Sequence, residues 1–181
     1  DVREYKITDL RDKIGIVPQK AVLFAGTVRS NLAWGKEDAT EEEMQQALSV
    51  AQAAEVVDKK DGKLDAEVEQ GGKNFSGGQK QRLTIARALV KQPEILIMDD
   101  SSSALDYATD AKLRQAIHNM PNRPTVFIVS QRAASIMYAD KIIVLDDGTV
   151  AGTGTHEELL KDCSVYQEIY YSQFKRTEGG H

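Results

Sequence analysis

Short apolar runs alternate along the chain with stretches whose apolar residues recur every three to four positions. The runs at 14–17 (IGIV), 94–98 (EILIM) and 125–130 (TVFIVS) have the length of strands. The last two are almost unbroken, which is typical of strands buried on both faces of a parallel sheet. Because these strands are separated by helical stretches, we expect an α/β fold with a mainly parallel sheet.

Helical periodicity begins at Thr40 and continues to about residue 59. Thr40 and Glu43 stand in the register of a capping box, and the apolar residues that follow lie on one face of the predicted helix. The next segment, 60–74, is polar and rich in glycine, which indicates a loop.

A second helix is predicted to begin at Ser76, because its hydroxyl suits an N-cap and Gln79 follows three residues later. Pro93 marks the end of this helix. Together with the helix from Thr40, it interrupts the alternation of strands and helices. We therefore expect a helical subdomain, at about residues 27–92, inserted in the sheet.

The remaining elements are shorter. Trp34 is interpreted as a packing residue. We predict a turn at 101–106, helices at 107–118, 132–138, 155 onward and 165–174, and a hairpin of 141–145 and 149–151 turned by Asp-Gly.

Composition narrows the class of protein. The chain has 181 residues and a formal net charge of −5, and its acidic balance argues against a general nucleic-acid surface. The single cysteine, Cys163, excludes an internal disulfide, and no apolar run approaches the roughly 20 residues of a membrane-spanning helix. No leader segment is recognisable either. These features predict a soluble, intracellular globular chain.

The segment 75–79 (FSGGQ) is the first candidate for chemistry. Gly77 and Gly78 lie just inside the predicted helix, where uncovered backbone N–H groups, the helix dipole and the Ser76 hydroxyl favour an anion such as phosphate. Taken alone, the pattern fits equally a glycine-rich helix start that binds nothing.

An acidic pair, Asp99 and Asp100, follows the strand at 94–98. The carboxyl ends of parallel strands are where α/β sheets bind ligands. One carboxylate there can hold Mg²⁺, directly or through water, and its neighbour can polarise an attacking water. The alternative is an acidic cap for the following turn.

These segments together resemble the nucleotide-binding domain of ATP-binding cassette (ABC) transporters. FSGGQ is similar to the signature motif, ILIMDD to the Walker B segment, and SSSALD to the D-loop. Val17-Pro18-Gln19 is similar to the Q-loop, Gln131 occupies the switch position, and the ending VLDDGTVAGTGTHEELL is also similar. The resemblance spans residues 1–175 in order and is closest to multidrug-like exporters; residues 176–181 form a tail.

The resemblance implies a role for each of these residues and the cofactors ATP and Mg²⁺. Asp99 and Gln19 would bind the metal through water, Asp100 would stand in the position of the catalytic base, and Gln131 would contact the γ-phosphate. Ser76, Gly77, Gly78 and Gln79 would hold the nucleotide of a second domain in a head-to-tail dimer, and Asp106 would link the two sites. The loop 69–72 would contact the coupling helices of a transmembrane domain, which implies the cytoplasmic face of the cell membrane and no nucleic-acid partner.

Two departures from the family pattern concern one composite site. The base position holds Asp100 instead of Glu, and its carboxylate, one methylene shorter, has less reach toward an attacking water. The switch position holds Gln131 instead of His, and glutamine cannot become a cation. Because FSGGQ looks intact, this asymmetry resembles the degenerate-site half of a heterodimeric exporter. Slow hydrolysis in a homodimer is the alternative.

The phosphate-binding P-loop, G-x-x-x-x-G-K-[ST], is absent from the 181 residues. In the family it lies upstream of the Q-loop, so we expect it to precede Asp1. A chain without it is expected to bind ATP weakly and to be inactive by itself.

Two other functions remain open. The first is a regulatory module that binds ATP and dimerises with little turnover. The second is a soluble ABC ATPase of the DNA-repair or translation type, although the residues between Gln19 and Ser76 leave no room for a long coiled coil. The transported substrate cannot be inferred, because its specificity would lie in membrane helices.

Overall fold

The structure is a computed structural model and describes residues 1–101 and 103–174. The chain divides into two compact units, Asp1–Val129 and Ser130–His181. Among the described residues, no helix combines the length and the apolar character required to cross a membrane.

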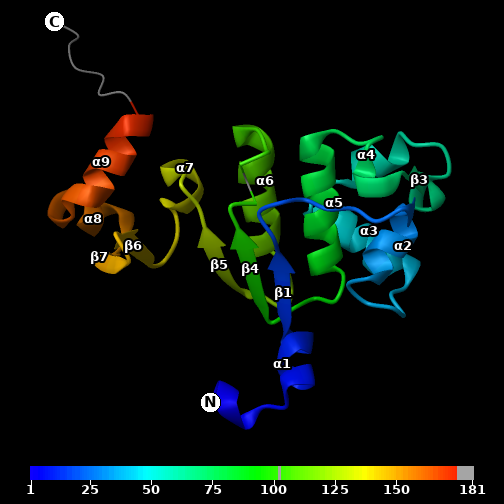
Figure 1. Cartoon of the computed structure of the whole chain (residues 1–181), viewed down its shortest axis with the longest axis horizontal. Coiled ribbons are helices and arrows are strands. Elements are labelled where there is room, and N and C mark those ends of the chain that lie inside the picture. The colour runs from blue at the N-terminus through cyan, green and yellow to red at the C-terminus, as the bar shows by residue number, and fades with distance from the viewer. Residues whose placement is uncertain (102, 175–181) are drawn as a thin grey trace, which may run out of the picture. The chain divides into compact units, whose positions relative to one another are not determined.

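The first unit is organised around a three-stranded parallel sheet in the order β1-β4-β5 (Figure 1). The strands are β1 (Ile14–Val17), β4 (Ile95–Asp99) and β5 (Thr125–Val129). Ile16 pairs with Ile97, and Ile97 with Phe127, so the three carboxyl ends meet at one edge of the sheet. The predicted α/β fold with a parallel sheet is confirmed.

The two faces of this sheet differ in burial. Val17, Leu96 and Met98 are buried in the core of the unit. On the opposite face, Phe127 is 57% exposed and Val129 58% exposed. The prediction that 125–130 forms a strand is correct, but the prediction that it is buried is wrong. It is the outermost of the three strands, and its apolar run reflects β-propensity without burial on both faces.

Helices flank the sheet in the first unit. The two long ones are α5 (Gly77–Leu89) and α6 (Tyr107–His118). The smaller elements between β1 and α5 are β2 (Gly26–Thr27), α2 (Val28–Ala33), α3 (Glu41–Val50), α4 (Ala54–Asp58), η2 (Lys63–Asp65), β3 (Glu67–Val68) and η3 (Gln70–Gly72). The segment 60–74, predicted as a loop, therefore contains three short elements.

The single helix predicted from Thr40 to about residue 59 is two helices. Thr40 and Glu43 form the predicted capping box, but α3 ends at Val50. Gln52 has a φ of 57°, its N–H donates to Ser49 O, and the Ala53 N–H donates to Leu48 O. These bonds form a Schellman motif, which ends the helix with a left-handed residue that is usually glycine. Because glutamine occupies that position, the sequence carried no stop signal.

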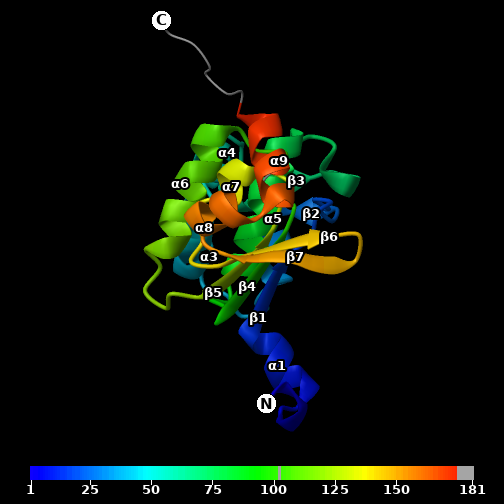
Figure 2. The same ribbon diagram turned by 90° about the vertical axis from the view of Figure 1, so that its left-hand side faces the viewer.

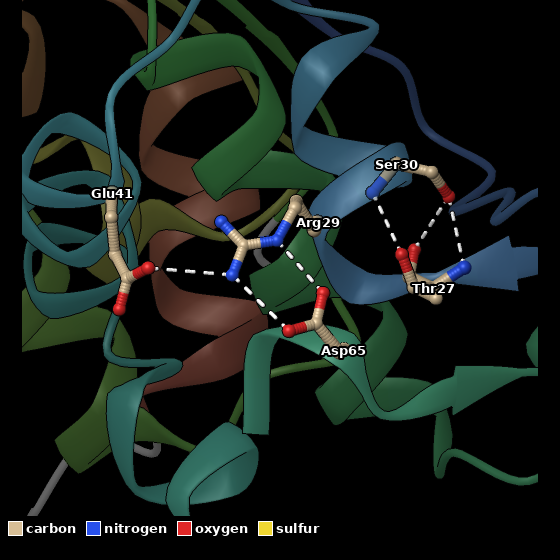
Figure 3. Close-up of polar contacts among 5 residues, drawn as sticks. All are labelled: Thr27, Arg29, Ser30, Glu41 and Asp65. Carbon is tan, nitrogen blue, oxygen red and sulfur yellow. Dashed lines mark hydrogen bonds and ion pairs between the residues drawn. The ribbon is translucent and has the colours of Figure 1, made fainter. Parts of the chain in front are cut away.

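Arg29 joins three elements of this region (Figure 3). Its guanidinium donates to both carboxylate oxygens of Asp65, at 2.8 and 3.2 Å, and to Glu41 Oε2 at 3.3 Å. The hydrogen bond from Arg29 lowers the pKa of the Asp65 carboxyl below its usual value. The neighbouring residues Thr27 and Ser30 form a capping box, which begins α2.

Gly35 is required where α2 ends close to α5. A Cβ at this position would lie 2.0 Å from the Arg87 carbonyl oxygen and 2.7 Å from Val90 Cγ1. Gly35→Ala must therefore separate the two helices, and we expect it to lower the free energy of unfolding by roughly 3 kcal/mol. Urea unfolding monitored by circular dichroism measures this loss. Gly77→Ala, whose Cβ meets nothing within 4 Å, is the matched control and should be nearly neutral.

The second unit is a hairpin packed on helices. β6 (Ile142–Asp146) and β7 (Thr149–Gly154) lie side by side (Figure 2), and Asp147 and Gly148 both have positive φ, as the predicted Asp-Gly turn requires. The helices are α7 (Ala133–Ile136), α8 (His156–Asp162) and α9 (Ser164–Gln173). Ile142, Val144, Leu159, Cys163 and Tyr166 form the core.

Two helices and a 3₁₀ turn are present that the sequence pattern did not indicate. They are η1 (Val2–Glu4), α1 (Ile7–Lys13) and α2. No residue of α1 is buried, and its N-cap, Lys6, makes no capping bond with its side chain. The capping box of α2 uses Ser30 where Glu or Gln is usual, so the usual start signals were missing.

Candidate nucleotide site

The carboxyl end of β4 carries the acidic pair. Asp99 is exposed and Asp100 half-buried, and the Asp100 N–H donates to Val129 O at 2.8 Å. Asp100 has a φ of 40°, a left-handed conformation that Asp tolerates better than most residues. The Ser103 hydroxyl donates to the Asp100 carbonyl at 2.9 Å, which fixes the turn after the strand.

Gln19 reaches the same edge of the sheet from the end of β1. Its side-chain Nε2 donates to Asp100 Oδ2 at 3.5 Å. This contact follows from the parallel pairing of β1 with β4, which places the residues after both strands side by side. The structure therefore brings together Gln19, Asp99 and Asp100, three of the residues selected from the sequence.

The chemistry of this set suits a hard divalent cation. Carboxylate and amide oxygens are ligands that Mg²⁺ accepts, and Mg²⁺ in phosphate sites takes only one or two protein carboxylates and keeps several waters. Among the residues that the structure describes, no three His, Cys, Asp or Glu side chains form a complete metal cage. The residues thus fit a magnesium ion that is shared with nucleotide phosphates.

The start of α5 is built by a local hydrogen-bond exchange. The Ser76 hydroxyl accepts from the Gln79 N–H at 3.3 Å, and Gln79 Oε1 accepts from the Ser76 N–H at 2.9 Å. This is the predicted capping box, and it directs the side chain of Gln79 back to its own helix. Ser76 and Gly77 are exposed, so their backbone lies at the surface of the unit.

Gly77 and Gly78 differ in what surrounds them. A Cβ on Gly77 would meet nothing within 4 Å, which leaves space for a ligand over the first turn of α5. A Cβ on Gly78 would lie 3.2 Å from the Ala104 carbonyl oxygen. Gly77 therefore keeps the surface open, and Gly78 permits close packing against the turn that precedes α6.

Asp106 is the N-cap of α6. Its carboxylate accepts from the Thr109 N–H at 2.9 Å and from the Thr109 hydroxyl at 2.8 Å. These bonds lower the pKa of the Asp106 carboxyl. The residue has a defined local task in starting the helix, besides the role across a dimer that the resemblance implies.

Gln131 belongs to the second unit. Its backbone carbonyl accepts from Gln173 Nε2 at 2.6 Å, while Gln173 Oε1 accepts from the Ala133 N–H at 2.9 Å. The end of α9 thus holds the segment that carries Gln131. Its side chain is exposed.

Trp34 does not have the packing role expected from the sequence. Its side chain is 70% exposed, and its ring lies 5.0 Å from that of Phe24, which is itself 43% exposed. The Arg87 guanidinium lies 5.3 Å from the Phe24 ring. No periodicity signals this group, because the three residues come from separate segments.

Comparison with known proteins identifies these motifs. The family described as ABC transporter matches residues 1–103. An uncharacterized ABC transporter ATP-binding protein of Mycobacterium bovis is 48% identical over 99% of this chain and 31% of its own length. The probable multidrug resistance ABC transporter ATP-binding/permease protein YheI of Bacillus subtilis is 42% identical over 99% of this chain and 31% of its own length.

Two further similarities concern exporters. The β-(1→2)-glucan export ATP-binding/permease protein NdvA of Rhodopseudomonas palustris is 42% identical over 96% of this chain and 29% of its own length. A bacterial Atm1-family ABC exporter solved with ATP bound has a TM-score of 0.88 and 37% identity, over 92% of this chain and 30% of that one. The chain spans about a third of the length of these relatives. It has the fold of an ABC exporter nucleotide-binding domain, and the chain belongs to the ABC transporter family.

Proposed function

We propose that this chain is the C-terminal part of the ATP-binding module of an ABC exporter, and that the full-length protein couples ATP hydrolysis to transmembrane efflux. The observation that carries the proposal is the similarity in sequence and fold to ATP-binding/permease proteins and to an exporter with ATP bound. The open first turn of α5 and the acidic edge of the sheet supply the corresponding chemistry.

The residues divide between two nucleotide sites. The Gly77 and Gly78 N–H groups and the Ser76 hydroxyl bind the phosphates held by a second domain, because a helix N-terminus offers unpaired donors and partial positive charge. Asp99 and Gln19 hold Mg²⁺ for the nucleotide of their own domain, and this ion offsets phosphate charge when bound. Asp100 orients the attacking water, Gln131 binds the γ-phosphate, and Asp106 connects the two sites.

The partners follow from this division. A second nucleotide-binding domain is needed head to tail, since a signature completes only the opposite site. The loop 69–72 contacts the coupling helices of a transmembrane domain at the cytoplasmic face. Residues 1–175 belong to the nucleotide-binding domain, with the helical subdomain at about 27–92 and a tail at 176–181.

Catalysis at the site that contains Asp100 and Gln131 is slow. Asp is shorter than Glu, and a general base must lie within roughly 2.6–3.2 Å of the proton that it removes. Gln131 donates a hydrogen bond but brings no positive charge to the phosphate. This pair of changes also supports a second candidate function, a regulatory module that binds ATP and turns it over very little.

The full-length protein, reconstituted in lipid vesicles with its partner domain, tests the proposed function. We expect ATPase activity that requires Mg²⁺ and no turnover by the isolated 181-residue chain, which contains no P-loop. Phosphate release and titration with a fluorescent ATP analogue measure the two quantities. Micromolar affinity of the isolated chain for the analogue, or vesicles without Mg²⁺-dependent turnover, contradicts the proposal.

A further inference from the structure

The ammonium group of Lys60 lies against the residues that precede Ser76. Lys60 follows α4, and its Nζ is 4.6 Å from the centroid of the Phe75 ring. The same Nζ donates to the Asn74 carbonyl at 3.1 Å. Phe75 is only 5% exposed, and Lys60 is half-buried. Among the described residues Lys60 takes part in no ion pair, so the ring and the carbonyl are the two groups that hold its charge.

Asn74 extends this contact to the preceding segment. Its Nδ2 donates to the Glu67 carbonyl at 2.8 Å, and its Oδ1 accepts from the Glu69 N–H at 3.1 Å. The Phe75 N–H donates to the Gly72 carbonyl at 3.0 Å. The backbone before Ser76 is therefore fixed on one side by β3 and on the other by Lys60.

The position of Phe75 determines where α5 begins. Ser76 and Gly77 follow it directly, and no further element separates the buried ring from the exposed N–H groups of the helix start. A cation over an aromatic face is attracted by the negative face of the ring. A leucine at position 75 would fill similar space but would offer the ammonium no such attraction.

We propose that Lys60 is a positioning residue for the signature segment: through Phe75 and Asn74 it holds Ser76 and Gly77 where their donors meet the phosphates of the opposite domain. This inference rests on the proposed function, since it assigns a support to the same phosphate-binding turn. Lys60 itself touches no nucleotide in this arrangement.

A double-mutant cycle in the full-length transporter tests the proposal. The four proteins are the wild type, Lys60→Met, Phe75→Leu and the double variant, because methionine keeps an apolar stem and leucine keeps an apolar core residue. We expect each single change to raise the KM for ATP about fivefold, with kcat changed less than about twofold. The double variant should be no worse than either single one, because both changes remove the same contact.

Lys60→Arg is the conservative variant and should keep a KM close to that of the wild type, because a guanidinium also binds over aromatic rings. Thermal unfolding of each protein sets an assay temperature at which all are folded. Multiplying KM effects in the double variant, an unchanged KM in Lys60→Met, or no rescue by arginine overturns the role of Lys60.

Gly77→Asp in the same preparation separates this inference from the proposed function. If Gly77→Asp abolishes turnover while Lys60→Met behaves as the wild type, only the role of Lys60 is wrong. If Gly77→Asp also leaves turnover unchanged, the proposed function of the signature segment is wrong and the inference falls with it.

Discussion

Gly77→Asp is expected to reduce ATP turnover in the full-length transporter roughly 100-fold or more, without destabilising the fold. The first turn of α5 contains no acidic residue, so a carboxylate there interacts favourably with the helix dipole, by about 0.3–1 kcal/mol. The same carboxylate occupies the open space over Gly77 and repels phosphate. Loss of one preorganised donor site for an anion typically costs factors of 10² to 10³ in rate.

Gly77→Ala is the matched control for this prediction. Its methyl group meets nothing within 4 Å and carries no charge, so folding should be unaffected and turnover should fall far less. Phosphate release measures the rate, and thermal unfolding confirms that each variant is folded. Equal turnover in the Asp and Ala variants contradicts a phosphate site at this turn.

Asp100→Glu combined with Gln131→His is expected to raise single-turnover hydrolysis at the altered site by on the order of tenfold or more. Glutamate supplies the missing methylene, and histidine supplies a group that can carry positive charge near the γ-phosphate. Rapid-quench measurement of ATP cleavage with protein in excess reports this site without interference from product release.

The backbone at position 100 supplies a check on this experiment. Asp100 has a φ of 40°, and glutamate tolerates the left-handed region less well than aspartate. Asp100→Glu alone should therefore lower the melting temperature slightly even as it extends the carboxylate. Asp100→Asn keeps the shape, removes the base, and should abolish the residual cleavage. Unchanged cleavage in the Glu/His variant would falsify the idea that these two residues limit the rate, and would favour the regulatory module.

Local signals carried most of the sequence interpretation that proved correct. The capping box of Ser76 and Gln79 depends on residues three apart, and the Asp147-Gly148 turn depends on adjacent residues. Parallel pairing then followed from the length and order of the apolar runs. Gln19 and Asp100, although distant in sequence, were selected together because both follow strands of one sheet.

The features that sequence reasoning missed depend on tertiary contacts. Gln52 ends α3 in a conformation usually taken by glycine, and the hydrogen bonds that hold it there leave no mark in the residue pattern. The exposure of Phe127 depends on what covers one face of the sheet, which an apolar run does not specify. The contact of Lys60 with Phe75 joins two sides of a polar segment that reads only as a loop.

Retention of radiolabelled ATP by the full-length transporter after rapid gel filtration tests most directly whether the signature of one domain and the acidic edge of another enclose nucleotide. Because Asp100 and Gln131 slow cleavage, the account predicts ATP that stays bound and uncleaved in the wild type and in Gly77→Ala, and that is lost in Gly77→Asp. Equal retention by Gly77→Asp, or no retained ATP in the wild type, would contradict it.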